Sequence, residues 1–226
     1  LNDSILKFFK EDIPKGVPLS HLDNLNKITI KRLLTMSVKD YTFGRLTCDN
    51  WLQHILSIPL PNVDRVVFEY SNLSSYLAGV IVEKTTKLNM MDYLQPRLLS
   101  QLGIKDVECE YSPEGHFYGA TGMKLTINEL SRFGQLYLQE GCYDGKQLLT
   151  KEWVTSASKK QIETREGGYG YYFWRYKGNS YRASGMRGQA CIVIPEKNAV
   201  IAVMSDLEKD SEEMRQCIWD TIYPKL

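Results

Sequence analysis

Tyr70 and Asn72 stand two residues apart at the start of an apolar segment, in the stretch FEYSNLSSYLAG. A phenol and a carboxamide at this spacing could serve a nucleophilic reaction, in which one group moves a proton and another positions the substrate. The same stretch also fits a structural role, because Asn72 or Ser71 could cap the helix that follows. Composition alone favours the cap. A phenol with a pKa of about 10 is also a poor base at neutral pH unless a neighbouring cation lowers that pKa.

The helix after this turn is predicted from its hydrophobic spacing. Apolar residues recur at i, i+3, i+4, i+7 and i+8, which is typical of one buried face of a helix that begins directly after Tyr70. The face consists of Leu73, Tyr76, Leu77, Val80 and Ile81. A cap and a chemical role are compatible, because a capped turn would hold Tyr70 and Asn72 toward a cleft.

Other helices are predicted from their caps and breakers, whereas residues 37–67 are expected to be irregular around two prolines. The expected helices are one capped by Thr29, one over 90–102 interrupted at Pro96 and ended by Gly103, one opened by the capping box of Thr126 and Glu129, one capped by Thr150, and a C-terminal helix from about Ser211 with Met214, Cys217, Ile218 and Ile222 on one face.

From Tyr169 onward the pattern changes to short aromatic and β-branched runs separated by turns. The runs are YGYYFWRY, SYRAS, ACIVIP and AVIAVMS. They predict four strands of an antiparallel meander. The predicted fold class is therefore α+β, with a mainly helical region over 1–165, strands plus a covering C-terminal helix over 166–226, and a single domain over 1–226.

The composition narrows the function classes. A chain of 226 residues with 43% hydrophobic residues has enough apolar material for one large domain or two packed lobes. The 28 basic and 27 acidic residues are mixed along the sequence, so no nucleic-acid footprint is expected. No apolar run reaches the roughly 20 residues of a membrane span, and the N-terminal stretch is too charged for an export signal.

The five cysteines are odd in number and widely spaced, which is unlike a disulfide framework or a zinc site. The three histidines show no metal-ligand spacing, and each is expected to be a surface or hydrogen-bonded residue. No metal and no cofactor are predicted.

Several segments together resemble one enzyme family. KITIKRLLTMS, FEYSNLSSYLAGVIVEKTT, GATGMKLTINELSRFGQLYLQEG, QLLTKEWV, YGYYFW and YRASGMRGQ occur in the order and approximate spacing seen in serine hydrolases related to class C β-lactamases, a group that includes penicillin-binding DD-peptidases and esterases. The resemblance spans nearly the whole chain and implies a β-lactamase/transpeptidase-like fold. Enzymes of this group use a Ser-x-x-Lys, a Tyr-x-Asn, and a Lys-Thr-Gly or variant on a sheet strand.

The resemblance assigns roles to five residues. Tyr70 would move protons beside the nucleophile, and Asn72 would hydrogen-bond the substrate amide or the catalytic lysine. Ser184 and Gly185 would line the strand side of the site, and the Met186 N–H would donate to the oxyanion. A glycine at 185 would also let a substrate backbone approach the strand edge closely.

This sequence departs from the third motif at Ala183, where the family has a cation that helps to hold a β-lactam or peptide carboxylate. The departure shifts the expected substrates toward esters or other amides. Arg182 and Arg187 flank the position and could restore positive charge, although an arginine beside a turn is more often solvated.

A Ser-x-x-Lys occurs at Ser156-Ala-Ser-Lys159, and we interpret it as a polar helix end because it follows Tyr70 in chain order. The nucleophilic serine and its lysine are expected upstream of residue 1, with two further strands of the sheet. The 226 residues are thus expected to be an N-terminally incomplete portion of a longer protein, and inactive alone.

The function implied by the resemblance is serine hydrolysis through an acyl-enzyme, on an ester, amide or β-lactam carbonyl of a small molecule. The alternative is a catalytically inert binding protein that keeps the fold and the cleft. The unpaired cysteines favour a reducing, cytoplasmic compartment. The sequence carries no sign of the oligomeric state.

Overall fold

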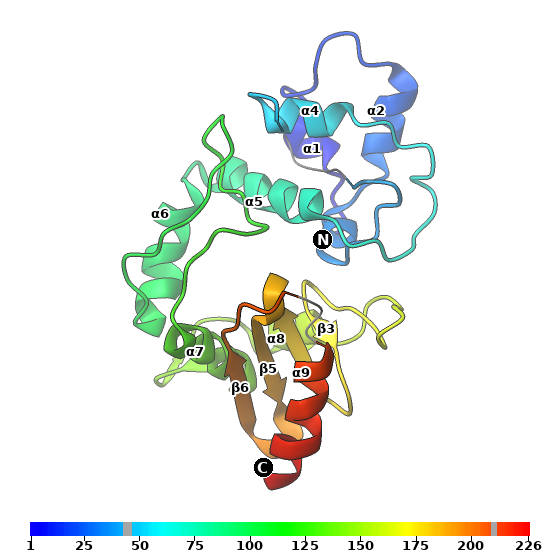
Figure 1. Cartoon of the computed structure of the whole chain (residues 1–226). Coiled ribbons are helices and arrows are strands. Elements are labelled where there is room, and N and C mark those ends of the chain that lie inside the picture. Colours follow the sequence, from blue (N-terminus) through cyan, green and yellow to red (C-terminus); the bar gives the residue numbers. More distant parts are fainter. Residues whose placement is uncertain (43–46, 209–211) are drawn as a thin grey trace. The chain divides into compact units, whose positions relative to one another are not determined.

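The computed structural model describes residues 1–42, 47–208 and 212–226. The chain divides into two compact units (Figure 1). The first unit comprises Leu1–Ser100 and Lys105–Lys124, and the second unit comprises Gln101–Ile104 and Leu125–Leu226.

The first unit is helical and is built around one long helix. Its helices are α1 (Leu6–Phe9), α2 (Leu19–Asn26), α3 (Ile30–Leu34), α4 (Trp51–Ser57), α5 (Asn72–Thr86) and α6 (Met90–Leu94). All five residues of the predicted apolar face of α5 are buried, and they join residues of α1 to α4 in one hydrophobic cluster. The hydrophobic spacing therefore identified the central helix of this unit correctly.

Helix α4 lies inside the segment that was predicted to be irregular, so that prediction is wrong for residues 51–57. Asn50 caps the helix, because its Oδ1 accepts the Gln53 N–H at 2.8 Å. Leu52, Ile55 and Leu56 are buried at a helical i, i+3, i+4 spacing. This helical spacing was present in the sequence, but the two prolines that follow it led to the prediction of an irregular segment.

The helical segment after α5 is interrupted where the sequence predicts. Helix α6 passes into a π-helical turn over Gln95–Leu99 and then into a 3₁₀ turn over Ser100–Leu102. Pro96 sits in the π turn, where its missing N–H cannot complete an α-helical ladder. Gly103 ends the segment with a φ of +67°, a conformation that glycine adopts without strain.

The second unit contains the predicted antiparallel meander. Its strands are β3 (Trp174–Arg175), β4 (Tyr181–Ser184), β5 (Ala190–Ile194) and β6 (Ala199–Val203), hydrogen-bonded in the order β3-β4-β5-β6. The unit also contains α7 (Ile127–Leu138), α8 (Lys151–Ser158) and α9 (Glu212–Cys217), and a small hairpin of β1 (Cys142–Tyr143) and β2 (Lys146–Gln147). The side-chain caps predicted at Thr126 and Thr150 in this unit, and at Thr29 in the first unit, are all formed.

Strand β5 is buried on both faces, because helices cover each of them. On one face, Gly134 of α7 comes so close that a Cβ there would lie 2.5 Å from Val200 Cγ1 and 2.7 Å from Cys191 Sγ. On the other face, Ile192 and its same-face neighbours pack with Ile218 after α9. Figure 1 shows β5 and β6 between α7 and α9, so the predicted covering of the sheet by the C-terminal helix is confirmed.

The apolar face predicted for the C-terminal helix is only half correct. Met214 and Ile218 pack on the sheet, whereas Cys217 is exposed and Ile222 is 41% exposed. A π-helical turn over Ile218–Ile222 follows α9 and shifts the helical phase by one residue, so Tyr223 packs where Ile222 was expected. The predicted start at Ser211 lies outside the described residues.

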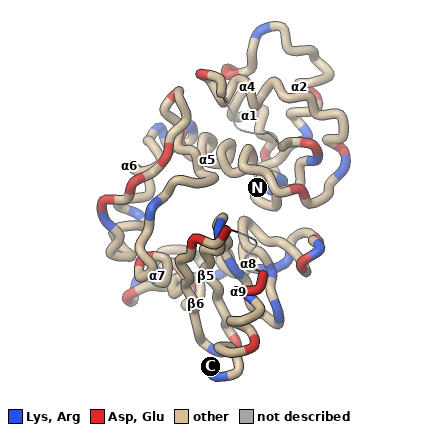
Figure 2. Tube along the Cα trace, in the orientation of Figure 1, with Lys and Arg blue, Asp and Glu red and all other residues tan. Residues whose placement is uncertain are grey.

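Figure 2 shows basic and acidic residues interspersed along both units. No helix formed by the described residues is long and apolar enough to cross a membrane. All five cysteines are free thiols, and among the described residues no group of three or more His, Cys, Asp or Glu side chains could hold a metal ion.

Candidate active site

The turn before α5 is fixed by the residue between the two candidate side chains. Ser71 is 3% exposed and extended, with φ −148° and ψ 118°, and its hydroxyl donates to the carbonyl of the fully buried Tyr41. Its backbone N–H contacts Met36 Sδ at 3.2 Å, and the Glu69 N–H donates to the Met36 carbonyl at 2.7 Å. The turn is therefore attached to the core through Ser71.

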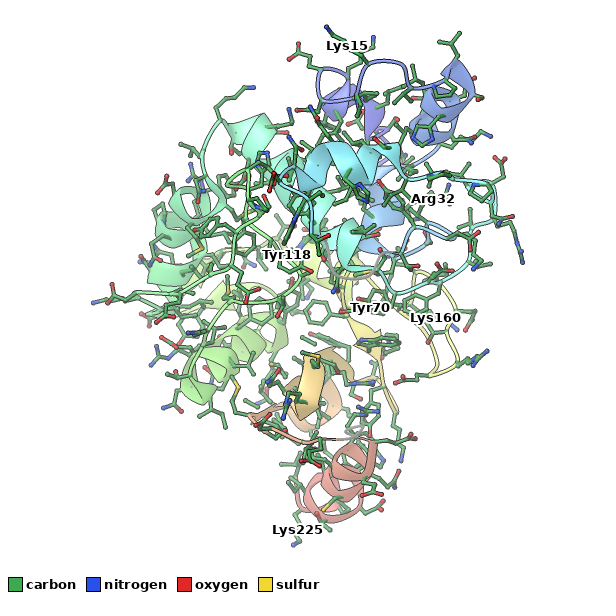
Figure 3. All side chains as sticks on the ribbon, turned by 45° about the horizontal axis from the view of Figure 1, so that its top comes forward. Lys15, Arg32, Tyr70, Tyr118, Lys160 and Lys225 are labelled. Atoms are coloured by element: carbon green, nitrogen blue, oxygen red, sulfur yellow. The ribbon has the colours of Figure 1, made fainter. Side chains whose placement is uncertain are left out.

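Tyr70 and Asn72 are both exposed on either side of the buried Ser71. Alternate residues of an extended chain point to opposite sides, so an inward Ser71 turns its two neighbours outward. Tyr70, labelled in Figure 3, is 49% exposed. The structure thus brings these two predicted residues together at the mouth of α5.

The prediction of a side-chain cap for α5 is wrong. Ser71 occupies the N-cap position but makes no capping hydrogen bond, because its hydroxyl is used by the Tyr41 carbonyl. Asn72 is the first residue of the helix rather than its cap. The Ser71 carbonyl still accepts the Ser74 N–H at 3.2 Å. Asn72 therefore does not cap the helix, and of the two roles predicted for its side chain only the chemical one remains a prediction.

Partial burial raises the pKa of the Tyr70 phenol above its ordinary value. This direction is opposite to the one that a general base needs. A cation beside the phenol would lower its pKa, so a base role for Tyr70 requires such a neighbour.

Helix α5 is held to its surroundings by buried polar contacts as well as by its apolar face. The Tyr76 hydroxyl donates to Glu114 Oε1 at 2.7 Å, and the same oxygen accepts the Leu52 N–H at the start of α4 at 2.8 Å. Burial raises the pKa of Glu114, but these two hydrogen bonds and backbone N–H donors outweigh it, so its pKa lies below the ordinary value. Glu114 thus links the start of α4 to α5 through hydrogen bonds to one carboxylate oxygen.

A carboxylate of α5 itself, that of Glu83, reaches the same loop. Glu83 is 9% exposed; its Oε2 lies 2.7 Å from His116 Nδ1, and its Oε1 accepts the Met90 N–H at 3.0 Å. His116 is therefore hydrogen-bonded, as the sequence predicts, and so is His21, whose Nε2 lies 2.7 Å from the Leu56 carbonyl oxygen. The contacts of Glu83 support the helix that carries Asn72.

Ser184, Gly185 and Met186 lie together where β4 ends in the second unit. Ser184 pairs with Ala190 of β5, and the Gly185 N–H donates to the Gln189 carbonyl at 2.8 Å, which closes the turn. Met186 is 78% exposed and opens a 3₁₀ turn. The first N–H of such a turn has no acceptor within the helix, so this donor can serve an oxyanion.

Two glycines shape this turn for different reasons. A Cβ at Gly185 would lie 2.5 Å from Gln189 Oε1 and 3.1 Å from Gln189 Cβ. The packing of the turn therefore favours a glycine at this position, independently of the predicted approach of a substrate. Gly188 has a φ of +91°, and a Cβ there would overlap Ser205 Oγ. The turn is therefore packed closely against the segment after β6.

The arginine that precedes Ala183 is not solvated, so the interpretation of Arg182 as a surface residue is wrong. Its side chain is 2% exposed, and its Nη2 donates to Glu166 Oε2 at 2.5 Å. Burial lowers the pKa of the guanidinium, and Glu166 opposes that shift. Its Nε donates to Ser184 Oγ at 2.9 Å. No local sequence signal revealed these contacts, because Glu166 lies 16 residues away along the chain.

Arg187 is exposed and forms an ion pair with Asp206. Both flanking arginines, Arg182 and Arg187, therefore have carboxylate partners within the second unit. Neither supplies an unpaired cation in place of the one that is missing at Ala183.

The Ser156–Lys159 stretch lies at the C-terminal end of α8, and Lys159 is its extended C-cap residue. This placement agrees with the interpretation as a polar helix end.

The chain matches the family model described as Beta-lactamase over residues 15–220. Among solved structures, a class C β-lactamase in complex with cefoxitin is similar at a TM-score of 0.76 and 16% identity, over 100% of this chain and 77% of the other. A Bacillus anthracis protein described as a candidate 6-aminohexanoate-dimer hydrolase is similar at a TM-score of 0.72 and 21% identity, over 100% of this chain and 65% of the other.

A penicillin-binding protein homologue from Caulobacter crescentus is similar at a TM-score of 0.68 and 14% identity, over 91% of this chain and 70% of the other. At these identities the likeness shows the fold, which is β-lactamase/transpeptidase-like as predicted. The chain spans 65% to 77% of the length of these three proteins. No curated protein sequence matches the chain significantly.

Proposed function

The chain belongs to the β-lactamase family, and we propose that it carries the proton-transfer and strand-side groups of a serine hydrolase. The hydrolase would act through an acyl-enzyme on an ester, amide or β-lactam carbonyl of a small molecule. The nucleophilic serine and its lysine would lie upstream of residue 1.

The observation that supports this proposal most is the turn over residues 70–72. Its central residue is buried and bonded to the core, while Tyr70 and Asn72 on either side are exposed at the mouth of a buried helix. A turn that only started a helix would not need a buried serine that leaves the helix end uncapped. A chemical role requires side chains held in place by supporting residues, and the buried Ser71 would supply that support for Tyr70 and Asn72.

Each predicted residue has one role in this proposal. Tyr70 moves the proton between the nucleophile and the leaving group, with the upstream lysine as the cation that lowers its raised pKa. Asn72 positions the substrate or the lysine. Ser184 and Gly185 line the strand side, and the Met186 N–H joins the N–H of the nucleophile as an oxyanion donor.

Substrate preference follows from Ala183. Without a cation at this position, and with both neighbouring arginines paired, a substrate carboxylate gains little here. We therefore expect esters and simple amides to be hydrolysed faster than penicillins.

The test uses the chain expressed with its natural upstream coding sequence. Covalent labelling of one serine by a fluorophosphonate, together with hydrolysis of short nitrophenyl esters, is the expected result. Tyr70→Phe should lower kcat by about a hundredfold or more, the usual contribution of a positioned acid or base. Tyr111→Phe is the matched control, because Tyr111 is also partly exposed, at 43%, and its pKa is likewise raised by burial.

Absence of labelling and of ester hydrolysis would show instead an inert binding protein with the same fold. Equal losses of activity in the two tyrosine variants would return Tyr70 to a packing role.

A further inference from the structure

Among the residues that the structure describes, Arg182 has the largest fully buried side chain. It lies on β4 directly opposite Trp174 of β3. Burying a guanidinium costs several kcal/mol unless its N–H groups and its charge find partners. A buried arginine beside a candidate site therefore calls for a specific reason.

The partners of Arg182 come from three directions within the second unit. Nη2 meets Glu166 at 2.5 Å, and the guanidinium carbon lies 4.9 Å from the ring centroid of Tyr176 and 5.6 Å from that of Trp174. Nη1 is buried and has no hydrogen-bond partner among the described residues. Two rings and one carboxylate thus leave few orientations for the guanidinium.

The remaining contact is the one to the candidate site, where Arg182 Nε lies 2.9 Å from Ser184 Oγ. We propose that Arg182 is a positioning residue, which holds the Ser184 hydroxyl so that its own proton points away from the guanidinium. This inference rests on the proposed function of Ser184 in substrate binding.

The direction of the hydrogen bond follows from the chemistry of the two groups. Arginine has only donors, so Ser184 Oγ must accept the Nε–H. The serine proton is then left to donate to an acceptor atom, such as a carbonyl or ether oxygen of a substrate. A charged donor also makes this hydrogen bond stronger than one between neutral groups.

Arg182 does not act as a substitute for the family's cation at position 183. Neighbouring residues of a strand point to opposite faces, so Arg182 shares a face with Ser184 and not with Ala183. Its charge is also compensated by Glu166. Orienting the serine is the role that remains.

A double-mutant cycle on the protein with its natural upstream segment tests the inference. Arg182→Gln and Ser184→Ala, alone and combined, are compared by kcat and KM on a nitrophenyl ester. We expect each single change to lower kcat/KM by about tenfold, a hydrogen bond to a charged group being worth at least this factor. Arg182→Gln should cause no further loss once Ser184 is alanine.

Two variants separate positioning from folding. Glu166→Gln alters a half-exposed partner and should lower kcat/KM only while Ser184 is present. Arg175→Gln is the matched control, because Arg175 lies on β3 and donates to the Ser158 carbonyl at 2.9 Å rather than to Ser184. Its effect should be the same with serine or alanine at 184.

Equal losses from Arg182→Gln in both backgrounds would overturn the inference. If the natural-length protein is not labelled by a fluorophosphonate, the proposed function fails separately. The cycle is then read from thermal unfolding, where coupling between Arg182 and Ser184 is expected and strict additivity would refute the positioning contact.

Discussion

Ser71→Ala tests whether the buried serine holds the turn that presents Tyr70 and Asn72. The change removes a hydroxyl that donates to the Tyr41 carbonyl, and both groups lie in the core. Leaving a buried acceptor short of a donor costs about 1–3 kcal/mol. For a chain of this size, each kcal/mol lowers Tm by about 2–4 °C. A midrange loss of about 2 kcal/mol therefore lowers Tm by about 4–8 °C.

The assay is thermal unfolding followed by circular dichroism, with Ser57→Ala as the matched control. Ser57 loses the same atom, but it is exposed and its hydroxyl donates only to the Gln53 carbonyl one helical turn back, at 2.7 Å. Surface changes of this kind usually alter stability by less than about 0.5 kcal/mol.

A second measurement links the turn to the proposed chemistry. In the protein expressed with its natural upstream coding sequence, and well below its Tm, Ser71→Ala should react with a fluorophosphonate more slowly than Ser57→Ala, because Tyr70 and Asn72 lose their anchor. If the two serine variants unfold at the same temperature, Ser71 does not hold the turn. A lower Tm with unchanged labelling would show that the turn keeps its shape without the hydroxyl.

Two further predictions concern contacts that support the two clusters of candidate residues, which are Tyr70 with Asn72 and residues 184–186. Gly188→Ala should lower stability by more than about 1–2 kcal/mol, the cost of a left-handed conformation, because its Cβ would also overlap Ser205 Oγ. Gly145→Ala, with a φ of +73° and no atom within 4 Å, should show the conformational cost alone. Equal losses of Tm in the two variants would contradict the packing argument. Glu114→Gln should make Tm less dependent on pH: the folded pKa of Glu114 lies below its ordinary value of 4.5, so its contribution is present above that pH and is lost as the pH falls through the lowered pKa. The Tm difference between the two proteins should thus shrink on acidification below 4.5, and a constant difference would exclude a role for the Glu114 charge.

Periodicity predicts those elements whose residues bury a regular face. The face of α5 and the strands of the meander are correct for this reason. It fails where the backbone changes its period, as in the π turn that follows α9. A π turn needs one residue more per turn, and no residue type in Ile218–Ile222 announces it.

The candidate site is predictable only in part, because its supporting contacts join residues that lie far apart in sequence. Tyr70, Asn72 and Ser184 are found through the family motifs. The ion pair of Arg182 with Glu166 and the bond from Ser71 to Tyr41 join residues 16 and 30 positions apart. A rule that treats an arginine near a turn as solvated considers only its neighbours along the chain.

The two clusters share one physical requirement, which the motifs do not state. In Tyr-x-Asn the middle residue is unspecified, yet here it is the buried one, since an extended backbone can turn two side chains outward only by turning the one between them inward. On β4 the same alternation places Arg182 and Ser184 on one face, with Ala183 on the other. Under the proposed function, the residues that orient the candidate side chains, Ser71 and Arg182, are polar, buried and outside the motif letters. Position 71 should accept only a small side chain with a donor if the turn is to keep this shape.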